Sequence, residues 1–181
     1  MRLFVAIELD EKFWEQLVEL QDALRRVQPD ISYTRPENFH LTLKFIGDFE
    51  ESKLPQLCDS LNEVLKMGEF SMALTALDFL PERGPIRIIG AAVNGGGKLE
   101  VLQRMVEVAC GRLEIPMENR RYRPHITLAR ARRALPRSSK AKLISSAPVT
   151  PVESLVDGFV LMQSKLSDKG AGYTPLHHVQ I

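Results

Sequence analysis

The chain is poor in cysteine and aromatic residues and contains no long apolar run. Its 181 residues include two cysteines, one tryptophan and three tyrosines. Cys58 and Cys110 form neither a CxxC pair nor a Cys/His metal spacing, so we expect two reduced cysteines packed in helices. No stretch approaches the roughly 20 apolar residues of a membrane span, and the N-terminal apolar run is too short for a signal peptide. We therefore expect a cytoplasmic protein without a membrane segment.

In other respects the composition is ordinary. Apolar residues make up 44% of the chain and charged residues 26%, which is typical of globular proteins and predicts neither disorder nor a fibrous repeat. A chain of this length can bury the core of one compact domain. We expect one two-lobed domain over residues 1–181, with a monomer favoured.

A large net charge is also missing, but the charges are unevenly distributed. The formal net charge is +1. Between Asn119 and Val152, however, the sequence has nine basic residues and no acidic one, which leaves 15 basic and 23 acidic residues, a net charge of −8, in the remainder. A localised basic surface favours a polyanion, although a solvated basic loop has the same pattern. The nine residues are Arg120, Arg121, Arg123, Arg130, Arg132, Arg133, Arg137, Lys140 and Lys142.

The first half of the sequence recurs in the second half at a constant offset of 85 residues. Arg2-Leu3-Phe4 aligns with Arg87-Ile88-Ile89, and His40-Leu41-Thr42-Leu43 aligns with His125-Ile126-Thr127-Leu128. Each half predicts a strand, a helix and a strand that bears a histidine. The predicted strands are 3–9, 39–46, 70–79, 87–93, 125–129, 156–164 and 173–181, and the predicted helices are 11–27, 53–67 and 98–113. We expect an α+β fold in which a pseudo-twofold brings the histidine strands together at a central groove.

The duplicated His-x-Thr pattern carries a specific chemistry. Side chains alternate along a strand, so His40 and Thr42 share one face, as do His125 and Thr127. A neutral imidazole can deprotonate an attacking water, while a protonated one donates to a leaving oxygen. Threonine hydroxyls and a guanidinium such as that of Arg130 can bind phosphate oxygens. A lone histidine on a strand is more often structural, but two copies favour catalysis on a phosphodiester, without a metal or cofactor.

Two other signals are weaker. The run from Asn94 to Lys98 lacks the spacing of a phosphate-binding loop and is typical of a turn before a helix. His177 and His178 are adjacent, so they point to opposite faces of a strand and are interpreted as structural or surface residues. A metal bound between His40 and His125 would be incidental.

The motifs resemble those of a known superfamily. HLTL and HITL are similar to the HxTx pair of the 2H phosphoesterases, and RLFVAIEL, HLTLKFIGD, RPHITLAR and SKLSDKGAGYTPL resemble the bacterial and archaeal RNA 2',3'-cyclic phosphodiesterases, also called 2'-5' RNA ligases. The resemblance covers essentially the whole chain. It implies a two-lobed α+β fold with antiparallel sheets lining a central cleft, hydrolysis of RNA 2',3'-cyclic phosphates to 2'-phosphomonoesters, and ATP-independent 2',5' joining of RNA ends. It assigns His40 as proton donor, His125 as proton acceptor, and Thr42, Thr127 and Arg130 as phosphate contacts.

The sequence departs from the family at two positions where tryptophan is frequent, which here are Tyr33 and Gly90. Tyr33 or Phe45 could stack on a base. Strict alternation from His40 turns Phe45 toward the core unless a bulge intervenes, so we leave Phe45 out of the predicted site.

The predicted partner is RNA with a 2',3'-cyclic phosphate end. Arg123, Arg132 and Arg133 are the predicted contacts to its backbone. Transfer RNA halves, short oligonucleotides and small cyclic nucleotides are all open as substrates. Two further hypotheses stay open: RNA ligation as the main reaction, and a binding module that holds such RNA ends without turnover.

Overall fold

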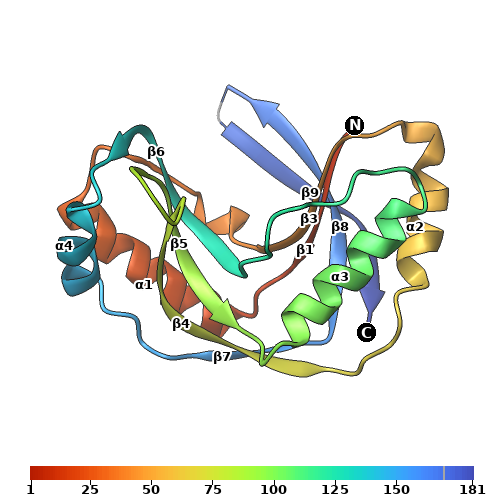
Figure 1. Cartoon of the computed structure of the whole chain (residues 1–181), viewed down its shortest axis with the longest axis horizontal. Helices are drawn as coiled ribbons and strands as arrows, with labels where there is room; N and C mark the ends of the chain where they lie inside the picture. The colour runs from red at the N-terminus through yellow and green to blue at the C-terminus, as the bar shows by residue number, and fades with distance from the viewer. Residues whose placement is uncertain (169) are drawn as a thin grey trace.

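The computed structural model describes residues 1–168 and 170–181 and consists of one long, curled sheet with helices on its outer side (Figure 1). The strands are β1 (Arg2–Ile7), β2 (Ser32–Tyr33), β3 (Leu41–Asp48), β4 (Phe70–Leu80), β5 (Ile86–Asn94), β6 (His125–Leu135), β7 (Glu153–Val156), β8 (Gly158–Ser167) and β9 (Gly170–Gln180). The helices are α1 (Glu11–Val27), α2 (Leu54–Asn62), α3 (Lys98–Gly111) and α4 (Ser139–Ser146), with short 3-10 turns at Pro36–Asn38 and Glu51–Lys53. Within the described residues, no helix combines the length and apolarity needed to span a membrane.

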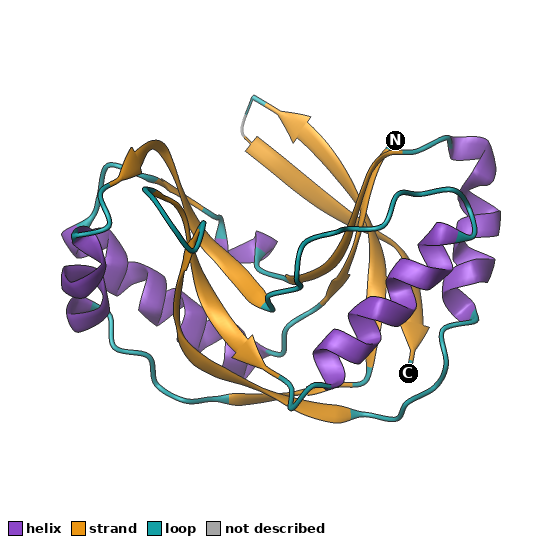
Figure 2. Ribbon diagram, in the orientation of Figure 1, coloured by secondary structure: helices purple, strands orange, loops and turns teal. Residues whose placement is uncertain are grey.

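The sheet is antiparallel and symmetric about its centre. Its strand order is β7-β4-β5-β6-β3-β1-β8-β9, with β2 added to β6, so the two histidine strands β3 and β6 are central neighbours. We call β3, β1, β8 and β9 with α2 and α3 the first lobe, and β6, β5, β4, β7 and β2 with α1 and α4 the second lobe. Figure 2 shows the helices at the two outer sides of the sheet. The predicted two-lobed α+β fold is confirmed.

The predicted duplication is visible in the order of elements. The unit β1, α1, β3 corresponds to β5, α3, β6, and α2 corresponds to α4 at the same offset. Each lobe nevertheless combines both sequence halves, because β8 pairs with β1 and β4 pairs with β5. The helices also cross over: α3 packs on β3 of the first lobe, whereas α1 packs with α4 and β7 of the second lobe. The two lobes are therefore interlocked.

Apolar side chains are buried on both faces of the sheet, but mainly beneath the helices. In α1, the apolar positions predicted to share one face are buried, and the side chain of Asp10 caps the helix by accepting a hydrogen bond of 2.8 Å from the backbone N–H of Phe13. Such a cap contributes about 1 kcal/mol. A second, smaller cluster lies on the face away from the helices, which we call the inner face. It consists of Phe4, Ala6, Val160 and Met162.

Several predicted boundaries were wrong. The helix expected over 53–67 begins with a 3-10 turn and ends at Asn62, because Glu63 and Val64 close tight turns onto Ser60 and Leu61. β6 continues past 129 to Leu135. Helix α4, within the basic stretch, was not predicted, since Leu143 is the one buried residue of that helix and its apolar pattern is weak.

Candidate active site

The two histidine strands meet at a single residue pair, Leu41 opposite Ile126. Both side chains are fully buried on the helix side of the sheet. Antiparallel register then sets His40 beside Thr127 and Thr42 beside His125, all on the inner face. The predicted HxTx residues are therefore brought together, in a twofold arrangement, at the centre of the sheet.

Both imidazole rings are held by the same type of hydrogen bond. Nδ1 of His40 lies 2.8 Å from the carbonyl oxygen of Asn38, and Nδ1 of His125 lies 2.8 Å from that of Arg123. Because a carbonyl oxygen can only accept, Nδ1 carries a proton in each ring. Nε2 is therefore the nitrogen that gains or loses a proton. Each ring can act as a base when Nε2 is bare and as an acid when it is protonated.

The surroundings of His40 are apolar and partly aromatic. Its ring centroid lies 4.8 Å from that of Phe4 and 5.2 Å from that of Tyr173, which meets it edge-on at 89°. Burial lowers the pKa of His40 below its ordinary value; the hydrogen bond to Asn38 opposes this, and the positive charges of Arg130 and His125 lower the pKa further. The register of β3 and β6 places His125 on the same face as His40.

A β-bulge follows each histidine at the same position. In β3, Thr42 pairs with Ala6 and Lys44 with Val5, so Leu43 is an extra residue. In β6, Thr127 pairs with Gly90 and Ala129 with Ile89, so Leu128 is the extra residue, 85 positions after Leu43. A bulge inverts the alternation of side chains beyond it. In each strand, the next residue on the inner face therefore lies three positions after the threonine, and not two as strict alternation predicts.

These bulges correct the prediction for Phe45. Phe45 does not turn into the core: it is 69% exposed, pairs with Phe4, and its ring centroid lies 6.3 Å from that of Phe4 on the inner face. Lys44 takes the buried position instead. Arg130 is the counterpart of Phe45 on β6 and is exposed, so the bulge also explains how the predicted phosphate contact reaches the inner face. The missed signal was the bulge, which an HxTx pattern alone does not reveal.

Buried polar contacts connect each histidine strand to the helix that covers it. In the first lobe, Nζ of Lys44 lies 2.7 Å from Glu107 of α3, and both side chains are at most 5% exposed. In the second lobe, Nε2 of Gln21 on α1 donates to the carbonyl oxygens of Thr34 and Leu128 at 2.7 and 2.9 Å. The bulged segments are therefore fixed from the helix side, by an ion pair in one lobe and by neutral hydrogen bonds in the other.

The comparisons with known proteins agree with this geometry. The model of a family described as LigT-like phosphoesterases matches residues 7–90 and again residues 91–173, one match for each half. The chain belongs to the LigT-like phosphoesterase family. A Thermus thermophilus protein named RNA 2',3'-cyclic phosphodiesterase is 33% identical over 97% of this chain and 88% of its own length.

Solved structures show the same fold. A crystal structure of a Thermus thermophilus protein matches with a TM-score of 0.82 and 30% identity, covering 99% of this chain and 97% of the other. Escherichia coli LigT, crystallised with 3'-AMP, matches with a TM-score of 0.80 and 23% identity over 99% and 97% of the two chains. The predicted family membership is confirmed.

The basic stretch of this family member divides into paired and unpaired side chains. Arg120 pairs with Glu118, and Arg123 pairs with Asp78 at 2.7 Å and with Glu82 at 3.7 Å. Arg132 and Arg133 are exposed on β6, and within residues 1–168 and 170–181 the structure describes no ion pair for either. Arg132 and Arg133 keep their charges available to a polyanion, whereas Arg123 is already engaged.

Tyr33 and Gly90 stand where the family often has tryptophan, and Gly90 has no side chain on which a base could stack. The Tyr33 hydroxyl donates to the carbonyl oxygen of Gln28, and Arg25 of α1 lies 4.6 Å from the ring centroid. Burial raises the pKa of Tyr33 to about 12. These contacts tie Tyr33 to its own strand-helix connection and to α1, and stacking of Tyr33 on a base stays a prediction. At Gly90, an added Cβ would lie 3.2 Å from Cδ2 of His125, so glycine lets this ring rest against β5.

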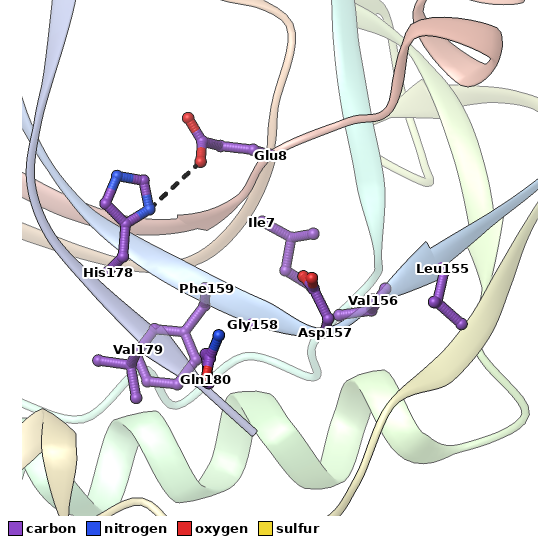
Figure 3. Close-up of a pocket in the computed structure, with 10 residues that line it drawn as sticks. All are labelled: Ile7, Glu8, Leu155, Val156, Asp157, Gly158, Phe159, His178, Val179 and Gln180. Atoms are coloured by element: carbon purple, nitrogen blue, oxygen red, sulfur yellow. Dashed lines mark ion pairs between the residues drawn. The ribbon is translucent and has the colours of Figure 1, made fainter.

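The remaining histidines lie outside the paired motif. His177 bonds to Asn62 of α2 at 2.8 Å, and Nδ1 of His178 lies 3.5 Å from Glu8, so the two rings point to opposite faces as predicted. Figure 3 shows His178 and Glu8 in a pocket of about 290 Å³ at the ends of β1 and β8, which contains neither His40 nor His125. In the described part of the chain, no three His, Cys, Asp or Glu side chains are grouped to hold a metal ion.

Proposed function

We propose that the protein hydrolyses the 2',3'-cyclic phosphate ends of RNA to 2'-phosphomonoesters, with His40 as proton donor and His125 as proton acceptor and without a metal. The observation that carries the proposal is the antiparallel junction of two His-x-Thr strands, in which both imidazoles are held through Nδ1. The relatives named RNA 2',3'-cyclic phosphodiesterase support the substrate class. The 3'-AMP complex of Escherichia coli LigT shows a nucleotide bound to this fold.

The reaction uses the free Nε2 of each ring. Nε2 of His125 removes a proton from water, whose oxygen forms a bond to phosphorus. The bond from phosphorus to the 3'-oxygen breaks, and this oxygen takes a proton from Nε2 of His40, leaving the phosphate on the 2'-oxygen. A 5'-hydroxyl in place of water would give the 2',5' linkage of the ligation reaction. Acid-base catalysis by such positioned groups contributes about 10²–10⁴-fold per group.

The phosphate contacts follow from the register. Thr42 lies beside His125 and Thr127 beside His40, so one hydroxyl is available on each side of a phosphate at the centre. Arg130 adds a guanidinium that can donate two hydrogen bonds to the non-bridging oxygens. The phosphate also assists the acid: its negative charge favours the protonated form of His40 and so opposes the lowering of the pKa by burial and by nearby positive charges.

Phe45 and the basic stretch are proposed to hold the rest of the RNA. The exposed Phe45 ring lies on the inner face next to Phe4, where a base can stack on it. Arg132 and Arg133 continue β6 beyond Arg130 and can contact backbone phosphates. In this arrangement, aromatic contacts lie on the first lobe and charged contacts on the second.

The test is turnover of an RNA oligonucleotide ending in a 2',3'-cyclic phosphate by protein freed of metal with a chelator. We expect a 2'-phosphate product, lost by at least about 10²-fold in His40→Ala and in His125→Ala. His177→Ala is the matched control, because this histidine bonds to Asn62, away from the paired motif, and should keep turnover.

Two results would contradict the proposal. Turnover that appears only with a divalent metal would remove the metal-independent mechanism. Binding of the RNA without turnover, with or without metal, would favour the binding module.

A further inference from the structure

The residues two positions before each histidine have side chains that are themselves anchored. Nδ2 of Asn38 donates to the carbonyl oxygen of Ala171 in β9 at 2.7 Å. Nη2 of Arg123 lies 2.7 Å from Oδ1 of Asp78 in β4. Each anchor reaches a strand of the lobe to which the corresponding histidine belongs. The carbonyl groups that accept from the two Nδ1 atoms therefore belong to residues fixed by their own side chains.

Asn38 and Arg123 occupy equivalent positions, 85 residues apart. Their side chains differ in chemistry, since one is a neutral amide and the other is a guanidinium in an ion pair, yet the local arrangement is the same. Each backbone carbonyl accepts from an imidazole at 2.8 Å, and each side chain binds another strand of the same lobe. Two different side chains that perform the same task at equivalent positions indicate a shared role in setting ring orientation.

Neither histidine lies within a long regular run of strand at its N-terminal side. Asn38 ends the 3-10 turn Pro36–Asn38, two residues before His40, and Arg123 lies in the irregular segment before β6. Ladder hydrogen bonds are therefore scarce where the accepting carbonyl groups must be held. The side-chain anchors supply the missing restraint, because each one ties its residue to a regular strand.

We propose that Asn38 and Arg123 are a matched pair of positioning residues, which fix the tautomer and orientation of His40 and His125 through their backbone carbonyl groups. The inference rests on the proposed function, in which both rings act through Nε2. It also changes the role of Arg123, whose guanidinium serves Asp78 rather than an RNA phosphate. Substitution to alanine removes the anchor but leaves the accepting carbonyl in place, so the two contributions can be separated.

The first test compares Asn38→Ala with Asn62→Ala. Both asparagine side chains make one hydrogen bond to β9, but Asn62 bonds to His177 and does not hold a histidine of the paired motif. We expect kcat to fall about 10-fold in Asn38→Ala with little change in KM, and to stay at the wild-type value in Asn62→Ala. Nitrogen-15 NMR should show His40 changing from a pure Nδ1–H tautomer to a mixture in Asn38→Ala alone.

The second test compares Arg123→Ala with Arg112→Ala. Both arginines pair with a carboxylate, but Arg112 pairs with Glu63 on the outer side of the first lobe. A positioning role predicts about a 10-fold loss of kcat in Arg123→Ala, a mixed tautomer at His125 and partial rescue by Arg123→Lys. A rise in KM that disappears at high salt, with kcat and tautomer unchanged, would instead assign Arg123 to RNA binding and overturn the pairing.

The NMR measurement separates this inference from the proposed function. If the wild-type protein fails to hydrolyse the cyclic phosphate, the function is wrong, but the tautomers in Asn38→Ala and Arg123→Ala still report on positioning. If the wild-type protein is active and both rings keep a pure Nδ1–H tautomer with unchanged kcat in these variants, the positioning role is wrong while the function stands.

Discussion

The two lobes present the same backbone to the inner face but surround their histidines differently. His40 packs against Phe4 and Tyr173, and its strand carries Phe45 beyond the bulge. His125 rests against Gly90, and its strand carries Arg130 at the position of Phe45. The β-bulge that follows each histidine is present in both lobes. The duplication therefore determines the positions of the two imidazoles, and the neighbouring side chains make their surroundings different.

The largest expected difference between the lobes is in the loss of stability when their buried polar contacts are removed. Lys44→Met leaves the Glu107 carboxylate buried without its partner, so we expect the free energy of unfolding to fall by about 3–5 kcal/mol. Gln21→Leu in the second lobe removes two neutral hydrogen bonds, although the carbonyl oxygen of Leu128 still accepts from the backbone N–H of Thr34, and should cost about 1–3 kcal/mol. Urea unfolding measures both. Equal losses would show that the two contacts are energetically equivalent, and Lys44→Met combined with Glu107→Leu should recover part of the stability.

The residues beyond the bulges should affect different kinetic constants. Arg130→Ala removes the guanidinium proposed to bind the phosphate. It should lower kcat/KM for any cyclic phosphate, by a loss of transition-state stabilisation of about 2–3 kcal/mol. Phe45→Ala removes a stacking surface worth about 1–3 kcal/mol per base and should raise KM for RNA while leaving stability near wild type, since the ring is 69% exposed. Steady-state kinetics and thermal unfolding test this. An aggregated or unfolded Phe45→Ala protein would place the ring in the core after all.

The lowered pKa of His40 predicts a specific pH dependence. The unfolded chain binds a proton at the ordinary pKa of about 6.5, whereas folded His40 binds one only at lower pH. The contribution of His40 to stability is therefore complete above about pH 6.5 and declines as the pH falls from there to the folded pKa. His40→Asn should flatten this decline in unfolding measurements made across that range.

Proton NMR can follow the same group directly. The titration midpoint of His40 should lie below the ordinary value and should rise in Arg130→Gln, because the charge of Arg130 contributes to lowering it. Arg112→Gln, on the outer side, is the control. A midpoint at or above the ordinary value would mean that burial does not dominate at His40.

Charge-reversing substitutions in the basic stretch should have the smallest effect per residue, and this effect is on RNA binding. Arg132→Glu and Arg133→Glu should each weaken RNA binding by about 1 kcal/mol or somewhat more and reduce its salt dependence. Arg112→Glu applies the same change of charge at the end of α3 and should not alter either quantity. If the affinity and the salt dependence stay unchanged in the β6 variants, RNA does not pass over this end of the second lobe.

Much of this arrangement could be predicted from the sequence because it depends on periodicity and duplication. The bounds of α1 were predicted correctly from Asp10 and its apolar spacing, and the offset of 85 residues predicted that His40 and His125 share a face. The interlocking of the lobes could not be predicted, because the pairing of β8 with β1 depends on contacts between distant strands of similar apolarity.

The site residues that were missed depend on local irregularities. Alternation is reliable only in an unbroken ladder, so the bulge at Leu43 reversed the expected positions of Lys44 and Phe45. A lysine in an otherwise apolar strand was the available signal, since its burial requires a partner such as Glu107, which lies 63 residues away in sequence. The anchoring of Asn38 and Arg123 had no sequence signal beyond their equivalent positions.

The most direct measurement of the central claim is a double-mutant cycle on hydrolysis of an RNA 2',3'-cyclic phosphate by metal-free protein. If His40 and His125 act as one acid-base pair, His40→Ala, His125→Ala and the double variant should all be slowed to a similar rate, because removing either member disables the unit. If either single variant keeps wild-type turnover, or if the two losses multiply as independent effects, the paired mechanism is contradicted.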